Sequence, residues 1–101
     1  MAALAFEAEL WEHDGEGSWH FVTLPAELSA DIHAQTPPRP GFGAVRVEVV
    51  VGESTWSTSL FPDAKAGAYV LPMKRAVRER NGLQVGDRVA VTIQLLGEPA
   101  G

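Results

Sequence analysis

The amino-acid sequence predicts an all-β domain, mainly β with two short helices, folded as a small barrel. Apolar residues recur at every second position in several segments, and β-branched and aromatic residues are concentrated in the same segments. The connections between these segments are short, as in antiparallel meanders. Because closure of a sheet removes its unpaired edges, a barrel is favoured over an open sheet. The 101 residues are expected to form one domain with a flexible tail at residues 97–101.

Alternation and β-branched composition define the predicted strands. These lie at residues 4–12, 19–24, 45–51, 54–61, 69–71 and 88–96. In the first of them, Phe6 and Leu10 share the core side, whereas Trp11 falls on the solvent side with Glu9. The aromatic residues of the other strands are expected in the core, namely Trp19, Phe21, Trp56 and Tyr69.

Two segments that begin with proline are predicted to be helical. Pro25 and Pro72 suit the first turn of a helix, and they precede residues 26–34 and 73–81. Gly82 is well placed just after the second helix, where a left-handed residue commonly ends it. The remaining breaks are an Asp-Gly turn at residues 13–18, a proline-rich linker at 35–41, a Gly-Glu turn at 52–53 and a loop at 62–67.

The two halves of the chain, residues 4–53 and 54–98, repeat one pattern. In each half a strand runs into a Leu-Pro pair and a helix, and an alternating strand ending in Gly-Glu follows. The Leu-Pro pairs stand at residues 24–25 and 71–72. This repetition predicts a pseudo-two-fold barrel that arose from a duplicated unit.

Charge is distributed unevenly along the chain, whose formal net charge is −5. Residues 1–36 contain seven acidic residues and no lysine or arginine. Five basic residues lie between positions 74 and 88, namely Lys74, Arg75, Arg78, Arg80 and Arg88. Such an asymmetry can direct a partner to one region of the surface, although a charged stretch is commonly no more than a solvated face.

The composition and motifs exclude several classes of site. The absence of cysteine excludes disulfides, thiolate zinc sites, iron–sulfur clusters and a cysteine nucleophile. Four residues of types that can bind metal ions cluster near the first turn, namely His13, Asp14, Glu16 and His20. Their spacing matches no metal-binding motif, so we expect neither a metal nor a cofactor. No serine occupies a nucleophile elbow, so a non-catalytic role is favoured over an enzyme.

The expected cellular compartment is inferred from the absence of export and membrane signals in the sequence. The sequence shows no signal peptide and no apolar stretch of membrane-spanning length. We therefore expect a cytoplasmic protein with no membrane partner. We further expect a bacterial source and either a monomer, which the internal repetition allows, or a homodimer.

The sequence shows two family resemblances, one over residues 71–89 and one over nearly the whole chain. Residues 71–89 resemble the swapped-hairpin motif of AbrB-like and MazE-like DNA-binding antitoxins, in which a strand, a proline and a short basic helix precede Gly-Leu, Gly-Asp and an alternating strand. The whole chain resembles the family called domain of unknown function 1905. The residues that carry this resemblance are Phe6 and the segments 19–25, 56–62, 69–78 and 86–91. The resemblances imply a double-split β-barrel with both halves in one chain, but the second family has no established activity.

The favoured hypothesis is a non-catalytic binding or interaction domain for a protein or small-molecule partner. Its candidate binding residues are Trp56, Ser59, Lys74, Arg75, Arg78 and Arg88. Trp11 is a candidate partner contact because alternation places this large aromatic ring on the solvent side. The alternative for Trp11 is cover by a neighbouring loop.

Two other functions stay open. An AbrB/MazE-like DNA-binding regulator would use the basic residues, but a net charge of −5 makes nucleic acid the less favoured partner. The second alternative is a small-molecule or enzymatic groove near Trp56, Lys74 and Arg78.

Overall fold

Six strands and two helices form the part of the chain that the computed structural model describes, residues 3–13, 19–35 and 43–96. The strands are β1 (Leu4–His13), β2 (Trp19–Thr23), β3 (Val45–Val51), β4 (Ser54–Asp63), β5 (Ala68–Pro72) and β6 (Arg88–Leu95). The helices are α1 (Ala26–Gln35) and α2 (Arg75–Arg80). Every predicted strand and helix is confirmed, and no end differs from its prediction by more than two residues. Most of the predicted turn at 13–18 and of the predicted linker at 35–41, and all of the predicted tail at 97–101, lie outside the described residues.

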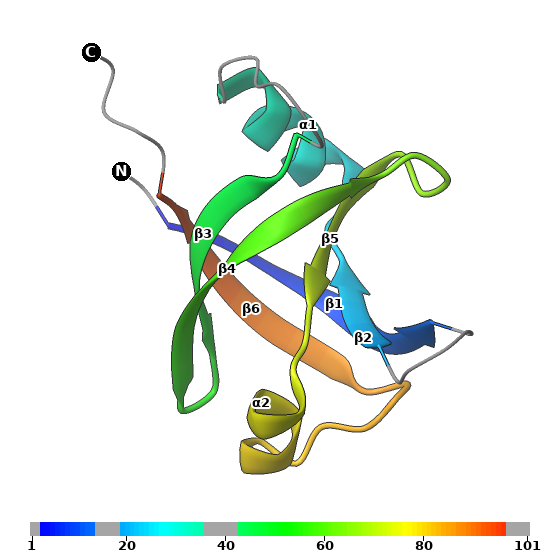
Figure 1. Ribbon diagram of the computed structural model, residues 1–101, viewed down its shortest axis with the longest axis vertical. Helices are drawn as coiled ribbons and strands as arrows, with labels where there is room; N and C mark the ends of the chain where they lie inside the picture. The colour runs from blue at the N-terminus through cyan, green and yellow to red at the C-terminus, as the bar shows by residue number, and fades with distance from the viewer. Residues whose placement is uncertain (1–2, 14–18, 36–42, 97–101) are drawn as a thin grey trace.

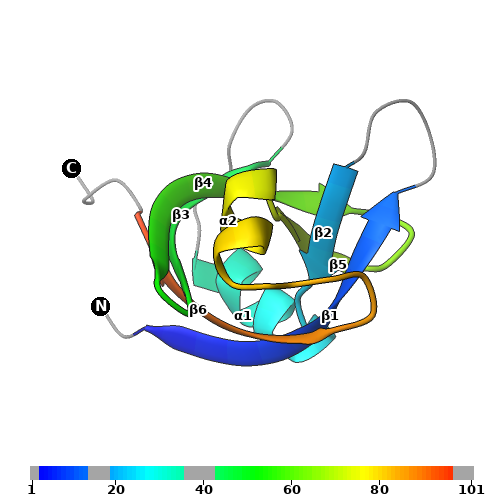
Figure 2. The same ribbon diagram turned by 90° about the horizontal axis from the view of Figure 1, so that it is seen from below.

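The strands form a closed antiparallel barrel in the order β1-β2-β5-β4-β3-β6 (Figure 1). Strand β6 pairs with both β3 and β1, so the last strand closes the barrel against the first. This arrangement confirms the predicted class, an all-β barrel with two short helices. The helices lie at opposite ends of the barrel, as Figures 1 and 2 show together.

The strand order has an internal symmetry. Exchanging β1 with β4, β2 with β5 and β3 with β6 leaves the cyclic order unchanged. Two backbone hydrogen bonds follow the same exchange: the Leu24 N–H donates to the Tyr69 carbonyl at 2.9 Å. Its counterpart runs from the Met73 N–H to the His20 carbonyl at 2.8 Å. A duplicated unit would produce this symmetry, while the duplication itself and the double-split detail stay predictions.

Apolar side chains fill the interior of the barrel. Alternation places every second residue of β3 and β6 inside, and these residues are valine, isoleucine and leucine. The fully buried side chains include Leu10, Leu24, Ile32, Leu60, Leu71, Met73 and Ile93. Burial of each side chain of this size contributes about 1.5–3 kcal/mol. Because the interior is occupied, the two clefts described below lie at the ends of the barrel.

The predicted core position of the aromatic residues is only partly confirmed. Tyr69 is buried at 6% exposure, and Trp56 packs half-buried against the core. The prediction was wrong for Trp19, which is 57% exposed, and Phe21 is only half-buried. The reason is the phase of β2: Val22 takes the inner face, so Phe21 and Trp19 fall on the outer face.

A glycine ends α2 as predicted. Gly82 adopts φ +63°, a left-handed conformation that favours glycine. The Leu83 N–H donates to the Arg78 carbonyl at 2.9 Å, and the Gly82 N–H donates to the Glu79 carbonyl at 3.3 Å. These bonds satisfy the last carbonyls of the helix and turn the chain toward β6.

Candidate functional site

A cleft beside α2 gathers three of the candidate binding residues. This cleft, named the α2 cleft, has a volume of about 340 Å³ and lies between the start of β2, the end of β5 and α2. Its lining residues are Trp19, His20, Pro72, Met73, Lys74, Arg75 and Arg78. The cations Lys74, Arg75 and Arg78 therefore share one site, with apolar walls beside them.

The local backbone places these cations. The chain leaves β5 at Pro72 and stays extended at Lys74, with φ −69° and ψ 159°. Helix α2 then begins at Arg75, so Arg75 and Arg78 lie one turn apart on the same helical face. Buried Met73 and Val77 fix this short segment against the core. The three positive side chains consequently reach the same cleft.

Lys74 and Arg78 are held by contacts from neighbouring groups. The Lys74 Nζ lies 5.9 Å from the centroid of the Trp56 ring on β4, a cation–π distance. Arg78 is half-buried, and its Nε donates to the Met73 carbonyl at 3.0 Å. These contacts restrict the side chains before any ligand binds, which lowers the entropic penalty of binding.

Arg75 is paired on the helix surface. Its Nε donates to the Glu79 Oε2 at 2.7 Å. This hydrogen bond and the charge of Glu79 raise the pKa of Arg75 above its ordinary value. Both side chains are largely exposed, so water screens the pair and a bound anion can replace Glu79.

His20 contributes the inner wall of the α2 cleft. Its side chain is 10% exposed, and its Nε2 lies 4.0 Å from the Glu12 Oε2. The hydrogen bond from the Met73 N–H to the His20 carbonyl ties the start of β2 to the end of β5. The cleft therefore joins residues about fifty positions apart, which only the barrel brings together.

Two predicted binding residues lie away from the α2 cleft. Ser59 accepts a hydrogen bond from Arg46 Nη1 at 3.3 Å. It stands three positions from Trp56 in one strand, so the two side chains point to opposite faces of β4. Arg88, at the start of β6, pairs with Glu7 of β1 at 3.2 Å between Nε and Oε1. Trp56 therefore lies beside the cleft cations through its contact with Lys74, whereas Ser59 and Arg88 lie away from these cations.

Three aromatic rings form a row on the outer face of β1 and β2. Trp11 and Phe21 are cross-strand neighbours whose ring centroids lie 5.1 Å apart. Trp19 stacks on Phe21, with centroids 6.4 Å apart and ring planes 14° apart. The Trp11 Nε1 donates to the Thr23 Oγ1 at 2.9 Å, so β2 covers part of this ring. Trp11, Phe21 and Trp19 are named the aromatic row, and the role of Trp11 as a partner contact stays a prediction.

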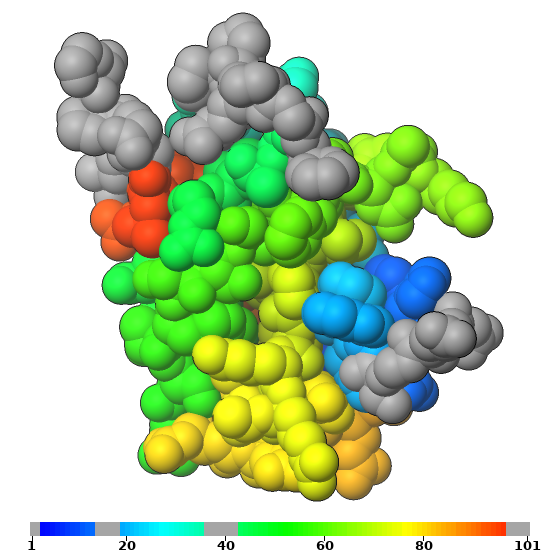
Figure 3. All heavy atoms as spheres, viewed as in Figure 1, coloured from blue at the N-terminus to red at the C-terminus, as the bar shows by residue number. Residues whose placement is uncertain are grey.

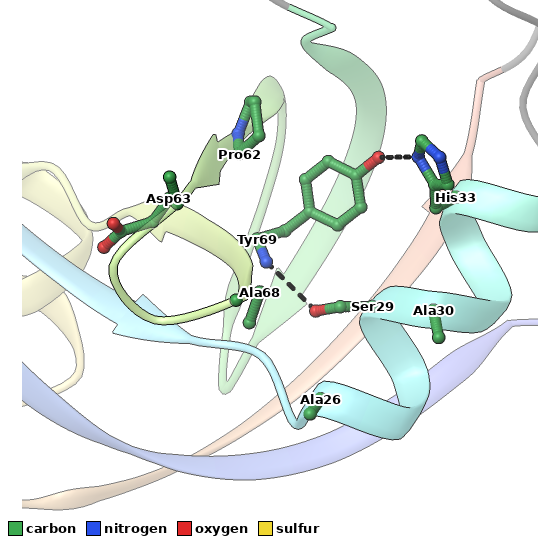
Figure 4. Close-up of a pocket in the computed structure, with 10 residues that line it drawn as sticks. Ala26, Ser29, Ala30, His33, Pro62, Asp63, Ala68 and Tyr69 are labelled. Carbon is green, nitrogen blue, oxygen red and sulfur yellow. Dashed lines mark hydrogen bonds between the residues drawn. The ribbon is translucent and has the colours of Figure 1, made fainter.

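A second cleft lies at the other end of the barrel, between α1 and the hairpin that joins β4 to β5 (Figure 4). This α1 cleft has a volume of about 490 Å³. Small or compact residues line much of it, including Ala26, Ala30, Pro62, Gly67 and Ala68. The exchange of halves described above relates the two clefts, because it replaces α1 and the start of β5 with α2 and the start of β2.

Tyr69 supplies much of the polar character of the α1 cleft. Its N–H donates to the buried Ser29 Oγ at 3.0 Å, and its hydroxyl lies 3.5 Å from the His33 Nδ1 (Figure 4). Helix α1 carries Glu27 and Asp31, whereas α2 is rich in arginine. Of the two clefts, the α2 cleft combines apolar walls with three cations, whereas no lysine or arginine is among the described residues that line the α1 cleft.

Comparison with known families identifies the family of this chain. A family model described as domain of unknown function (DUF1905) matches residues 6–93. The chain belongs to the DUF1905 family. The match covers both clefts and both helices, and it confirms the predicted family. The family description assigns no activity to a DUF1905 domain, and a comparison with curated proteins found no match.

The four possible metal ligands near the first turn do not form a metal site within the described part of this DUF1905 domain. The His13 side chain lies on the outer face of the first hairpin, and the His20 side chain lies on the inner face, so the two histidines do not converge. Asp14 and Glu16 lie outside the described residues. Within residues 3–13, 19–35 and 43–96, no three His, Asp or Glu side chains are grouped to hold a metal ion.

No helix in the described part of the DUF1905 domain is long and apolar enough to cross a membrane.

Two features of the structure were not predicted from the sequence. The aromatic row was missed because the segment 19–24 was given the wrong phase. A signal was present, since placing Val22 and Leu24 inside puts Trp19 and Phe21 outside. The contact of Ser29 with Tyr69 had no signal in the sequence, because it joins a helix to a strand forty positions away.

Proposed function

We propose that this DUF1905 domain is a non-catalytic binding module of the bacterial cytoplasm whose α2 cleft takes an anionic ligand with an apolar part. One observation carries this proposal: Lys74, Arg75 and Arg78 converge on a single cleft. Clefts that bind small ligands combine apolar walls with a few convergent polar groups, and the α2 cleft has both. Its apolar walls come from Trp19, Pro72 and Met73.

The chemistry of the three cations favours carboxylate or phosphate. Guanidinium groups match the geometry of both anions with two parallel hydrogen bonds, and an ammonium group adds a point charge. Arg78 is anchored by the Met73 carbonyl, and Lys74 is held over Trp56. In this proposal Lys74, Arg75 and Arg78 contact the anion, and Trp56 positions Lys74.

The test uses phenyl phosphate as a probe and benzyl alcohol as its uncharged counterpart. In a two-dimensional amide NMR titration, phenyl phosphate should shift the resonances of Lys74, Arg75 and Arg78. Benzyl alcohol should bind about tenfold more weakly or not at all, because it lacks the charge-assisted hydrogen bonds. Absence of any shift at these three amides with millimolar phenyl phosphate overturns the proposal.

Two lysine variants give a matched comparison. Lys74→Met removes a cleft cation and should weaken phenyl phosphate binding about fivefold to tenfold. Lys65→Met removes an exposed cation from the turn between β4 and β5 and should leave the affinity unchanged. Equal affinities of the two variants would remove Lys74 from the site.

A further inference from the structure

We infer that the anionic ligand of the α2 cleft is single-stranded nucleic acid, with its bases stacked on the aromatic row and its phosphates held by the cleft cations. This inference rests on the proposed function and names the ligand class. It goes beyond that function because it adds a second surface, outside the cleft, to the binding site.

The aromatic row has the geometry of a stacking platform. Its three rings follow one another with centroid spacings of 5.1 and 6.4 Å, and Trp19 and Phe21 are within 14° of parallel. Trp19, at the end of the row, is 57% exposed. Trp11 and Phe21 are half-buried, so Trp19 is the most accessible ring of the row, and a large exposed aromatic ring on a barrel surface can anchor a partner. Unpaired bases stack on such rings without regard to sequence.

The row runs directly into the cationic cleft. Trp19 belongs to both, and Phe21 lies opposite Pro72, which also lines the cleft. On the face shown in Figure 3, the atoms at the start of β2 lie beside those of the segment from β5 to α2. A strand whose bases lie on the row therefore has Lys74, Arg75 and Arg78 within reach of its phosphates.

Carboxylates lie both near the α2 cleft and far from it. Glu27 and Asp31 are on α1, at the opposite end of the barrel from α2. Glu12 lies beside His20 of the cleft wall, and Glu79 pairs with Arg75. Because the net charge is −5, binding of a polyanion depends on the local group of Lys74, Arg75 and Arg78 and should weaken as salt rises.

The favoured form is single-stranded rather than duplex. Bases of a duplex are stacked on each other and cannot reach an outer row of aromatic rings. Helix α2 has only six residues, which is short for a recognition helix in a major groove. The observations therefore fit splayed bases with flanking phosphates.

The experiment compares three dye-labelled ligands by fluorescence anisotropy at low salt, about 50 mM. They are an oligothymidylate of about 12 nucleotides, an abasic strand of equal length and the corresponding duplex. We expect the oligothymidylate to bind at least tenfold more tightly than both others, because only it offers free bases. Trp19→Ala should weaken oligothymidylate binding about tenfold but weaken the abasic strand by no more than about twofold, because Trp19 also lines the cleft and only the oligothymidylate has bases to stack on its ring.

A matched aromatic control is available on β4. Phe61 is 41% exposed and lies outside the aromatic row, so Phe61→Ala should not change oligothymidylate affinity. Lys74→Met should weaken the oligothymidylate and the abasic strand equally and reduce the salt dependence of both.

The outcomes separate the inference from the proposed function. If phenyl phosphate binds but the oligothymidylate binds no better than the abasic strand, the inference is overturned and the proposed function stands. Preferential binding of the duplex, or no effect of Trp19→Ala, also overturns the inference. If neither phenyl phosphate nor any strand binds, both the inference and the proposed function are overturned.

Discussion

Ser29 shows how a single polar residue can organise one end of the barrel. It is 5% exposed, and its Oγ accepts the hydrogen bond of the Tyr69 N–H at 3.0 Å. Without this contact, the first turns of α1 would lose a polar link to the start of β5. A buried N–H that loses its acceptor is costly because no water replaces the hydrogen bond.

Ser29→Ala should therefore destabilise the domain. We expect the free energy of unfolding to fall by about 1–3 kcal/mol, the penalty for a buried and unsatisfied polar group. Urea denaturation measures this change. Ser57→Ala on the exposed face of β4 is the control and should change stability by less than about 0.5 kcal/mol. Equal effects of the two variants would show that the Ser29 hydrogen bond carries no stability.

At the scale of elements, Asn81 connects α2 to the hairpin between β3 and β4. Its Oδ1 accepts the Glu53 N–H at 3.1 Å, and its Nδ2 donates to Ser54 Oγ at 3.0 Å. The same Nδ2 donates to the Val77 carbonyl at 2.9 Å, within the helix. Gly52 packs closely under this amide, and its φ of +55° favours glycine. Asn81 therefore fixes the position of α2, the helix that carries Arg75 and Arg78 of the α2 cleft.

Asn81→Ala should loosen this connection. Loss of the three side-chain hydrogen bonds should lower the free energy of unfolding by about 1–3 kcal/mol. Hydrogen exchange at the Glu53 amide should accelerate, because its acceptor is removed. Unchanged exchange at Glu53 together with unchanged stability would contradict the assigned role of Asn81.

A double substitution separates collision from backbone strain at Gly52. A Cβ at this position would collide with Asn81 Oδ1 and would also be strained by the positive φ. Gly52→Ala should therefore be less destabilising in the Asn81→Ala background than in the natural chain. Equal effects in both backgrounds would mean that only the backbone conformation matters.

At the scale of the whole molecule, β6 completes the barrel. Ile93 has 0% exposure and lies opposite Leu4 of β1 and Val49 of β3. It therefore packs where the first and last strands meet. Closure of this kind depends on contacts between residues far apart in sequence.

Ile93→Ala should destabilise the whole barrel. We expect a loss of about 2–5 kcal/mol, the range for a large aliphatic residue replaced by alanine in a core. Thermal or urea unfolding followed at several wavelengths should show one cooperative transition at a lower midpoint. Gln94→Ala, on the exposed face of the same strand, should change stability by less than about 0.5 kcal/mol. A loss of similar size for Gln94→Ala would contradict the explanation that the buried side chain of Ile93 stabilises the barrel.

The candidate site could be predicted in part. Lys74, Arg75 and Arg78 were identified from charge and helical spacing, and the structure places all three around the α2 cleft. Ser59 was grouped with these cations because it lies near Trp56 in the sequence, and Arg88 because it belongs to the basic stretch. The structure places both residues away from the α2 cleft. The separation of Ser59 from Trp56 follows from alternation along β4, which is a local signal, whereas the pairing of β6 with β1 that places Arg88 beside Glu7 depends on the closed barrel.

By itself the sequence determined the six strands, the two helices and the family of this protein. Period-two alternation, proline at helix starts and Gly82 at a helix end are local signals, since backbone conformation depends mainly on near neighbours. Only the tertiary structure decided the barrel order, the strand pairing that brings Trp11 beside Phe21 and the polar contacts of Ser29 and Asn81. These features depend on strand pairing and burial between distant segments, which favour one arrangement only when the whole barrel closes.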